Sequence, residues 1–313
     1  MRIAVFGTGG VGGYFGGRLA QAGEEVVFLA RGDHLKALKN AGLRIESIKG
    51  DFHLHPVKAT DNPAEAGTVD VVLVTVKAWQ VPEAAQAIAP MLGSDTFVVP
   101  LENGVEAVSQ LSAVLDPSRV LGGLCKIISL VVRPGVIRHS GTVPYVAFGE
   151  LDNHVSDRAQ MLKQSFQRAG VNVEIPRDIH VAIWEKFLFI ASISGLGAVT
   201  RAPVGVLRSV PETRQILELA MREIFDVAKA LKISLPEDSI HKTLSFVDNL
   251  PPSGTASMQR DILEGRPSEL ETQNGAVVRL GRQAGVATPV HSFIYYSLLP
   301  LEMRARGQLT FPA

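Results

Sequence analysis

Several features are scarce in this sequence, and each shortage excludes a class of protein. Cys125 is the single cysteine, so no internal disulfide can form, which fits a reducing compartment and a buried, inert thiol. The 31 basic and 31 acidic side chains cancel, which gives no reason to expect a nucleic acid or an acidic membrane as partner. The apolar stretch from Phe187 to Val199 falls short of the ~20 residues that a membrane-spanning helix needs, so we expect no span.

The remaining composition is that of a globular protein. The chain has 313 residues, of which 46% are hydrophobic and 20% charged, and this length suits two domains with a sizeable core. The first apolar run begins almost at the first residue, so we expect no signal peptide and a cytoplasmic location. No internal repeat or low-complexity segment interrupts the chain.

The most informative stretch is the first one, MRIAVFGTGGVGGYFGG. Ile3 to Phe6 has the composition of a buried parallel strand, and apolar residues then recur at helical spacing beyond a glycine-rich turn. Such a turn at a helix start can hold the pyrophosphate of a dinucleotide on backbone N–H groups, although a purely structural glycine turn would look the same. The residues expected to contact the cofactor are Gly7, Thr8, Gly9, Gly10, Val11 and Gly12.

The second predicted strand, Glu25 to Ala30, ends at Arg31, where the adenosine ribose of a dinucleotide would lie. An acidic residue there would bind the ribose 2′-hydroxyl, whereas a guanidinium binds a 2′-phosphate well. Arg31 therefore favours NADP over NAD. The alternative is a solvated arginine, and the neighbouring Asp33 weakens the preference.

Two further strands end in polar residues. Val69 to Val76 is almost wholly apolar and is followed by Lys77, and Thr96 to Pro100 leads to Asn103. Because ligands of parallel sheets bind beyond the carboxyl ends of the strands, we expect Lys77 and Asn103 to face the same crevice and to contact the cofactor there. A soluble strand end and a tight Asn-Gly turn are the structural alternatives.

The sequence predicts an α/β fold, with an N-terminal Rossmann-type doubly wound sheet followed by an all-α C-terminal domain. Within the first part, Leu43 to Ile48 and Phe52 to Val57 resemble a two-stranded excursion at one edge. His53 and His55 there look like a solvated face, and no metal site is expected. The predicted antiparallel additions to the parallel sheet are Val120 to Val132, Val136 to His139 and Gly141 to Gly149.

The predicted domains are residues 1–177, an NADP-binding Rossmann-type domain, and residues 178–313, a helical domain that binds substrate and carries the catalytic residues. Amphipathic patterns in the second part predict helices over Thr213 to Leu231, Leu270 to Ala284 and His291 to Leu301. The apolar C-terminal helices could supply the face of a homodimer.

Together these pieces resemble the ketopantoate reductase (2-dehydropantoate 2-reductase) family. The stretches that carry the resemblance occur in the family's order, which is more specific than any single motif. They are GTGGVG, VTVKAWQ from Val74 to Gln80, Glu102-Asn103-Gly104, Trp184-Glu185-Lys186, Ser257 to Asp261, and Glu269 to Gly275.

The resemblance implies NADPH-dependent reduction of a 2-oxo acid, ketopantoate, to the 2-hydroxy acid pantoate, as in pantothenate biosynthesis. It implies that Lys186 is the general acid and that Glu269 accepts a hydrogen bond from the substrate hydroxyl. It also implies that Ser257 holds the substrate carboxylate, that Asn103 positions substrate and acid, and that Lys77 lies beside the cofactor. Asn274 would belong to the same pocket wall. Without the resemblance, Lys186 and Glu269 would read as a snorkelling lysine and a helix-start carboxylate.

One departure bears on the substrate. Well-known members of the family carry asparagines four and eight residues after the lysine, where this chain has Ile190 and Ser194. Ser194 could still contact the substrate, but Ile190 offers a more apolar wall, so we expect measurable but inefficient ketopantoate reduction and a preference for a more apolar 2-oxo acid. Full ketopantoate activity and a non-catalytic NADP(H) sensor are the alternatives, and the presence of both Lys186 and Glu269 disfavours a sensor.

Overall fold

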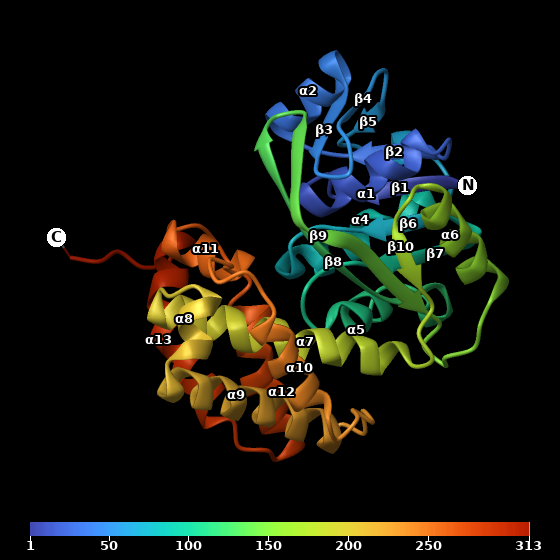
Figure 1. Cartoon of the computed structure of the whole chain (residues 1–313). Coiled ribbons are helices and arrows are strands. Elements are labelled where there is room, and N and C mark those ends of the chain that lie inside the picture. The colour runs from blue at the N-terminus through green and yellow to red at the C-terminus, as the bar shows by residue number, and fades with distance from the viewer. Residues whose placement is uncertain (313) are drawn as a thin grey trace. The chain divides into compact units, whose positions relative to one another are not determined.

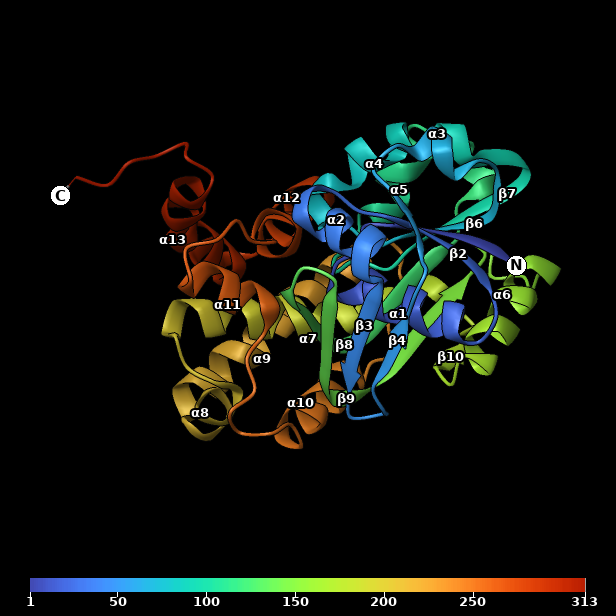
Figure 2. The ribbon, with the colours of Figure 1, turned by 90° about the horizontal axis from the view of Figure 1, so that it is seen from above.

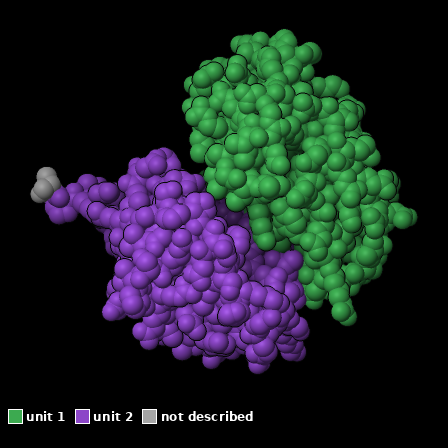
Figure 3. All heavy atoms as spheres, viewed as in Figure 1, with its two compact units in different colours: residues 1–102, 107–179 green, residues 103–106, 180–313 purple. Residues whose placement is uncertain are grey.

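A computed structural model describes residues 1–312, and these residues form two compact units (Figure 1). The first unit comprises residues 1–102 and 107–179, and the second comprises residues 103–106 together with the chain from 180 onward (Figure 3). The short segment 103–106 therefore leaves the first unit and returns to it. This detour matters because it places Asn103 in the second unit.

The first unit contains a five-stranded, wholly parallel sheet in the order β5–β2–β1–β6–β7. Its strands are β1 (Arg2–Phe6), β2 (Glu25–Leu29), β5 (Lys58–Thr60), β6 (Val69–Val74) and β7 (Leu92–Pro100). The chain starts at the central strand, builds outward to β5 and then returns to add β6 and β7. This order reverses between β1 and β6, where a Rossmann-type sheet binds its ligand. The predicted doubly wound sheet is confirmed.

Alternating residues of β1 enter two different cores, because successive side chains of a strand point to opposite faces. Ile3 and Val5 pack with helix α1 (Gly10–Gln21), whereas Ala4 and Phe6 pack with helices α4 (Val81–Ala87) and α5 (Ala107–Ser112). Figure 2 shows α4 and α5 on one side of the strands and α1 on the other. The remaining elements of this unit are α2 (Gly32–Ala41), α3 (Pro63–Ala66), α6 (Asp157–Arg168) and the 3₁₀ turns Ala78–Gln80, Ala89–Met91 and Pro117–Arg119.

The predicted antiparallel additions to the parallel sheet are wrong, because these segments form a second sheet. Its order is β10–β9–β3–β4, with β8 paired to β9, and an isolated bridge pairs Val98 of the first sheet with Val120, two residues before β8 begins. The segments predicted on either side of Ser140 are one strand, in which Gly141 has a φ of +76° and the pairing shifts register. Gly141 thus lies at a bulge within one strand and does not end it. The strands are β3 (Leu43–Ser47), β4 (Phe52–Leu54), β8 (Gly122–Arg133), β9 (Val136–Gly149) and β10 (Asn172–Glu174).

Helix α1 lies between the two sheets, and its glycines make this possible. A Cβ at Gly16 would come within 2.7 Å of Phe28 and Val5 of the parallel sheet. On the other face, a Cβ at Gly13 would come within 2.7 Å of Ile137 of the second sheet. The glycine-rich helix is therefore a thin spacer that lets both sheets approach it.

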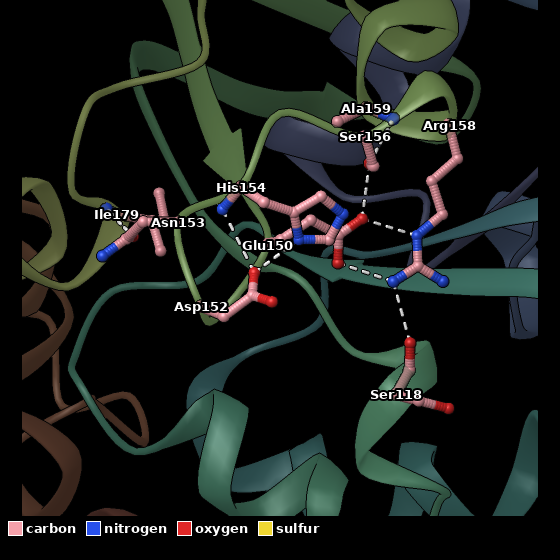
Figure 4. Close-up of polar contacts among 9 residues, drawn as sticks. All are labelled: Ser118, Glu150, Asp152, Asn153, His154, Ser156, Arg158, Ala159 and Ile179. Carbon is pink, nitrogen blue, oxygen red and sulfur yellow. Dashed lines mark hydrogen bonds and ion pairs between the residues drawn. The ribbon is translucent and has the colours of Figure 1, made fainter.

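A polar cluster fixes the chain after β9 (Figure 4). Glu150 accepts hydrogen bonds from Ser156 Oγ and from two nitrogens of Arg158, each at 2.6 Å. Burial raises the pKa of the Glu150 carboxyl, but the bonds from Arg158 and Ser156 outweigh it and hold that pKa below its usual value. Asn153 Oδ1 accepts the amide of Ile179 at 3.0 Å, which fixes the point where the next helix begins.

The second unit is helical around one main apolar core, as the sequence predicts. Its helices are α7 (Ile179–Thr200), α8 (Val204–Ser209), α9 (Pro211–Ala230), α10 (Ser239–Asp248), α11 (Ser257–Leu263), α12 (Ala276–Ala284) and α13 (Pro289–Ala305). The helix predicted from Leu270 to Ala284 is only partly correct. A π-helical turn, Glu271–Gly275, precedes α12 and shifts the register of the side chains next to Glu269.

Helix α7 is longer than its most apolar stretch suggests. Among the described residues it is the one helix whose length and composition would suffice to cross a membrane, which the short run from Phe187 to Val199 did not indicate. However, 67% of its most apolar 18-residue window is buried inside the protein. A core helix of a helical domain has this character, because it is apolar on every side.

Candidate active site

The glycine loop between β1 and α1 has the geometry that an anion site requires. Gly7 has a φ of +108°, which L side chains rarely adopt, and a Cβ at Gly12 would overlap the backbone oxygen of Gly7. Thr8 Oγ1 donates to the carbonyl oxygen of Leu29 at 2.9 Å, which ties the loop to β2. Gly9 precedes α1 as its N-cap and offers no side chain to the first N–H groups of the helix. These groups fit a pyrophosphate.

Arg31, just beyond β2, is exposed, and its partner is a carboxylate that the sequence did not indicate. Its Nη2 lies 3.0 Å from Glu83 Oε1, on helix α4. Asp33, the neighbour that seemed to weaken the case for a phosphate, instead accepts a hydrogen bond from Lys36 at 3.0 Å. The carboxylate paired with Arg31 is therefore Glu83, and Asp33 pairs with Lys36.

Lys77 follows β6 at the same edge of the parallel sheet and is half-buried. Its ammonium nitrogen lies 5.7 Å from the centre of the Trp79 ring, a distance typical of a cation–π contact. Its backbone N–H donates to Gln80 Oε1 at 3.3 Å. The side chain is thus positioned by the 3₁₀ turn that follows it.

The second unit contains a buried carboxylate that two amides contact. Glu269 is 4% exposed, and its Oε2 accepts hydrogen bonds from Asn103 Nδ2 at 3.0 Å and from Gln273 Nε2 at 3.2 Å. Of the residues singled out in the sequence, the structure therefore brings Asn103 and Glu269 together. Gln273, wholly buried, is a third member that sequence reasoning missed. Two amide donors on one oxygen fix the orientation of this carboxyl group.

Lys186 is half-buried on α7, and Ile190 and Ser194 follow it at intervals of one helical turn, so the three share a face. Ile190 is also half-buried, whereas Ser194 is wholly buried, and its hydroxyl has no hydrogen-bond partner among residues 1–312. Ser257 is half-buried at the first position of α11.

Asn274 packs the π-helical turn onto α7. Its Nδ2 donates to the carbonyl oxygen of Ala191 at 3.2 Å, and its amide occupies the space that a side chain at Gly195 would fill. The residue is wholly buried. Its contacts thus link the helix that carries Lys186 to the turn that follows Glu269.

His53, His55 and Cys125 have ring or backbone partners of their own. His53 Nε2 contacts the carbonyl oxygen of Ala41 at 2.6 Å, and the ring centres of His53 and His55 are 6.2 Å apart. Cys125 is buried and donates to the carbonyl oxygen of Leu101 at 3.3 Å. Within residues 1–312, no group of three or more His, Cys, Asp or Glu side chains is placed to hold a metal ion.

A Rossmann-like parallel sheet with a glycine loop, followed by an all-helical unit with a buried polar cluster, is the architecture of a two-domain oxidoreductase. Two family models match the chain. The model described as ketopantoate reductase PanE/ApbA matches residues 3–153, and the corresponding C-terminal model matches residues 178–302. The chain belongs to the ketopantoate reductase family.

Individual proteins agree with the family models. A 2-dehydropantoate 2-reductase of Nostoc sp. is 32% identical over 99% of this chain and 98% of its own length. The crystal structure of a 2-dehydropantoate 2-reductase from Geobacter metallireducens has a TM-score of 0.89 at 29% identity, and covers 97% of this chain and 100% of its own. A D-mandelate dehydrogenase, solved with NADH and anilino(oxo)acetate, shares the fold, with a TM-score of 0.89 at 24% identity over 98% of this chain and 99% of its own.

Proposed function

We propose that this protein catalyses the NADPH-dependent reduction of a 2-oxo acid, ketopantoate or a close relative, to the 2-hydroxy acid. The observation that carries the proposal is the buried Glu269 with its two amide donors, Asn103 and Gln273. A carboxylate held in this way can accept a hydrogen bond from a substrate hydroxyl. The names of the relatives supply the substrate class, and a cytoplasmic role in pantothenate biosynthesis is part of the proposal.

The nicotinamide cofactor supplies a hydride for the keto carbon. As the C=O bond becomes a C–O single bond, the oxygen gains negative charge and takes up one proton. We assign the proton donor to the Lys186 ammonium, which also stabilises the charge that develops on that oxygen. Asn103, Ser257 and Glu269 bind and orient the substrate. The glycine loop, Arg31 and Lys77 hold the cofactor.

Cofactor choice gives the first test. We expect the parent enzyme to prefer NADPH, and Arg31→Ala to reduce this preference by about tenfold or more, since a charge-assisted bond to phosphate is lost. Glu83→Gln removes the competing carboxylate from Arg31, so it should shift the preference about two- to fivefold toward NADPH, the scale of an exposed ion pair. The measurement is kcat/KM with NADPH and with NADH.

Lys36→Ala serves as the control, because Lys36 pairs with Asp33 and not with Glu83. Comparable efficiency with NADH in the parent enzyme, or an unchanged preference in Arg31→Ala, would exclude the role given to Arg31. A loss of NADPH preference in Glu83→Gln would mean that Glu83 supports phosphate binding instead of opposing it.

Substrate choice gives the second test. With Ile190 in place of an amide, the site offers fewer hydrogen bonds, so we expect inefficient ketopantoate reduction and better kcat/KM with a more apolar 2-oxo acid. Ile190→Asn should raise kcat/KM for ketopantoate by about tenfold, the scale of one hydrogen bond to a polar substrate group. A panel of 2-oxo acids assayed with NADPH decides both points.

Ser194→Asn, alone and with Ile190→Asn, completes the comparison, and melting temperatures must accompany it. Ser194 is wholly buried, so a larger side chain there overpacks the core at a cost of about 1–3 kcal/mol. A parent enzyme that is already efficient with ketopantoate, with no gain from Ile190→Asn, would show that the departure is neutral. NADPH binding without reduction of any 2-oxo acid would instead favour an NADP(H) sensor.

A further inference from the structure

One guanidinium joins two segments of the second unit that are distant in sequence. Arg279, on α12, donates through Nε and Nη2 to the two carboxylate oxygens of Glu106, at 3.3 and 2.7 Å. Its Nη1 donates to Glu271 Oε1 at 2.5 Å. Arg279 thus forks between the loop 103–106 and the π-helical turn Glu271–Gly275. A planar guanidinium suits this geometry because its donors are fixed in one plane.

Other contacts hold the same two segments. Tyr295 donates its hydroxyl to Glu271 Oε2 at 2.5 Å, and burial, together with this bond, raises the pKa of Tyr295 to about 12. Gly104 has a φ of +109°, and a Cβ there would lie 3.0 Å from the carbonyl oxygen of Thr272. The loop therefore lies directly against the turn, and Glu271 is held from two directions.

These segments carry the two partners of the buried carboxylate cluster. Asn103 begins the loop that Glu106 ends, and Glu269 lies two residues before Glu271. The loop and the turn are therefore linked twice. The Asn103–Glu269 hydrogen bond links them directly, and Arg279 links them by binding both Glu106 and Glu271. We propose that Arg279 is a positioning residue that holds Asn103 and Glu269 at the distance at which they bind substrate. This inference rests on the proposed function for its catalytic meaning.

The energetics indicate that Arg279 positions the site residues more than it stabilises the fold. The Arg279 side chain is 37% exposed, and exposed ion pairs contribute little to folding. Burial lowers the pKa of Arg279, but the bonds to Glu106 and Glu271 outweigh it and hold that pKa above its usual value. The guanidinium therefore stays charged and bonded to both carboxylates. Removal of the guanidinium should therefore alter the position of the loop 103–106 more than it lowers the stability of the second unit.

The experiment compares Arg279→Ala, Arg279→Lys and a matched control, Arg282→Ala, an exposed arginine on the same helix. We expect Arg279→Ala to lower kcat/KM for the 2-oxo acid by about tenfold to a hundredfold, because small misplacement of site residues is costly. The Kd for NADPH should stay at the parent value. Hydrogen–deuterium exchange of the amides in 103–106 should become faster. Arg279→Lys should give kcat/KM and exchange rates between those of the parent enzyme and Arg279→Ala, because an ammonium cannot bind both carboxylates in the way that a planar guanidinium does.

Three outcomes would overturn the inference. Parent kinetics together with parent exchange in Arg279→Ala would show that the fork is dispensable. A loss of activity matched by the loss of folded protein, seen in the melting temperature, would assign Arg279 a structural role only. An equal loss of kcat/KM in Arg282→Ala would show that positive charge on α12 is what matters, and not the contacts of Arg279 with Glu106 and Glu271. If the parent enzyme reduces no 2-oxo acid, the proposed function fails, and the exchange measurement still decides whether Arg279 holds the loop.

Discussion

Lys186→Ala should bind NADPH as the parent enzyme does and lose turnover by about two or more orders of magnitude, the usual scale for a lost general acid. The reason is that the oxygen of the 2-oxo acid must receive a proton as its carbon receives hydride, and the ammonium also stabilises the developing charge. Lys186 is half-buried on α7, next to the buried Trp184 and Phe187.

The measurement is single-turnover reduction under saturating NADPH, with cofactor affinity determined separately by fluorescence. Lys229→Ala is a suitable control, because this lysine is exposed on α9 and pairs with Glu237. Lys186→Arg keeps the positive charge but yields its proton much less readily, so it should stay slow. Turnover of Lys186→Ala within a few-fold of the parent would mean that the proton comes from another group.

The predictions for the fold were most reliable where the signal is local. The apolar run of β1, the glycine loop and the helical periodicity of α1 are features of adjacent residues, and the structure has all three elements. Strand pairing is not local. The segments from Gly122 to Gly149 have strand composition, but nothing in them shows that β9 pairs with β3 and β10. A glycine inside a strand can mark a turn or a bulge, and only the pairing partner decides between them.

The site shows the same limit. The glycine loop, Arg31 and Lys77 follow from where strands end, and the resemblance to a family supplied Lys186 and Glu269. Glu83 and Gln273 had no such signal. Glu83 lies on α4, far from Arg31 in the sequence, and a glutamate there looks like any solvated first-turn residue. Gln273 would look like an ordinary polar position in a continuous helix, whereas the π-helical turn places its amide on the Glu269 carboxylate.

The other large effect is expected from Glu269. In the proposed function, Glu269 accepts a hydrogen bond from the substrate hydroxyl in the ground state as well as in the transition state, so Glu269→Ala should act mostly on KM. A hydrogen bond to a charged group is worth about 1.5–3 kcal/mol, so KM should rise roughly 10- to 100-fold, while kcat stays within about threefold. The substitution also leaves the Asn103 and Gln273 amides without this acceptor, so some stability should be lost.

Glu269→Gln separates the effect of the carboxylate charge from the effect of side-chain size. It keeps the size of the side chain, and its carbonyl oxygen can accept both bonds that Asn103 and Gln273 donate to one carboxylate oxygen. Its NH₂ group then replaces the second carboxylate oxygen and cannot accept a hydrogen bond from the substrate hydroxyl. We therefore expect Glu269→Gln to raise KM nearly as much as Glu269→Ala with a smaller change in melting temperature. Glu264→Gln, at an exposed position beyond α11, is the control. If KM for the 2-oxo acid is unchanged while kcat falls by orders of magnitude, Glu269 takes part in the proton transfer itself, and its assignment as a binding residue is wrong.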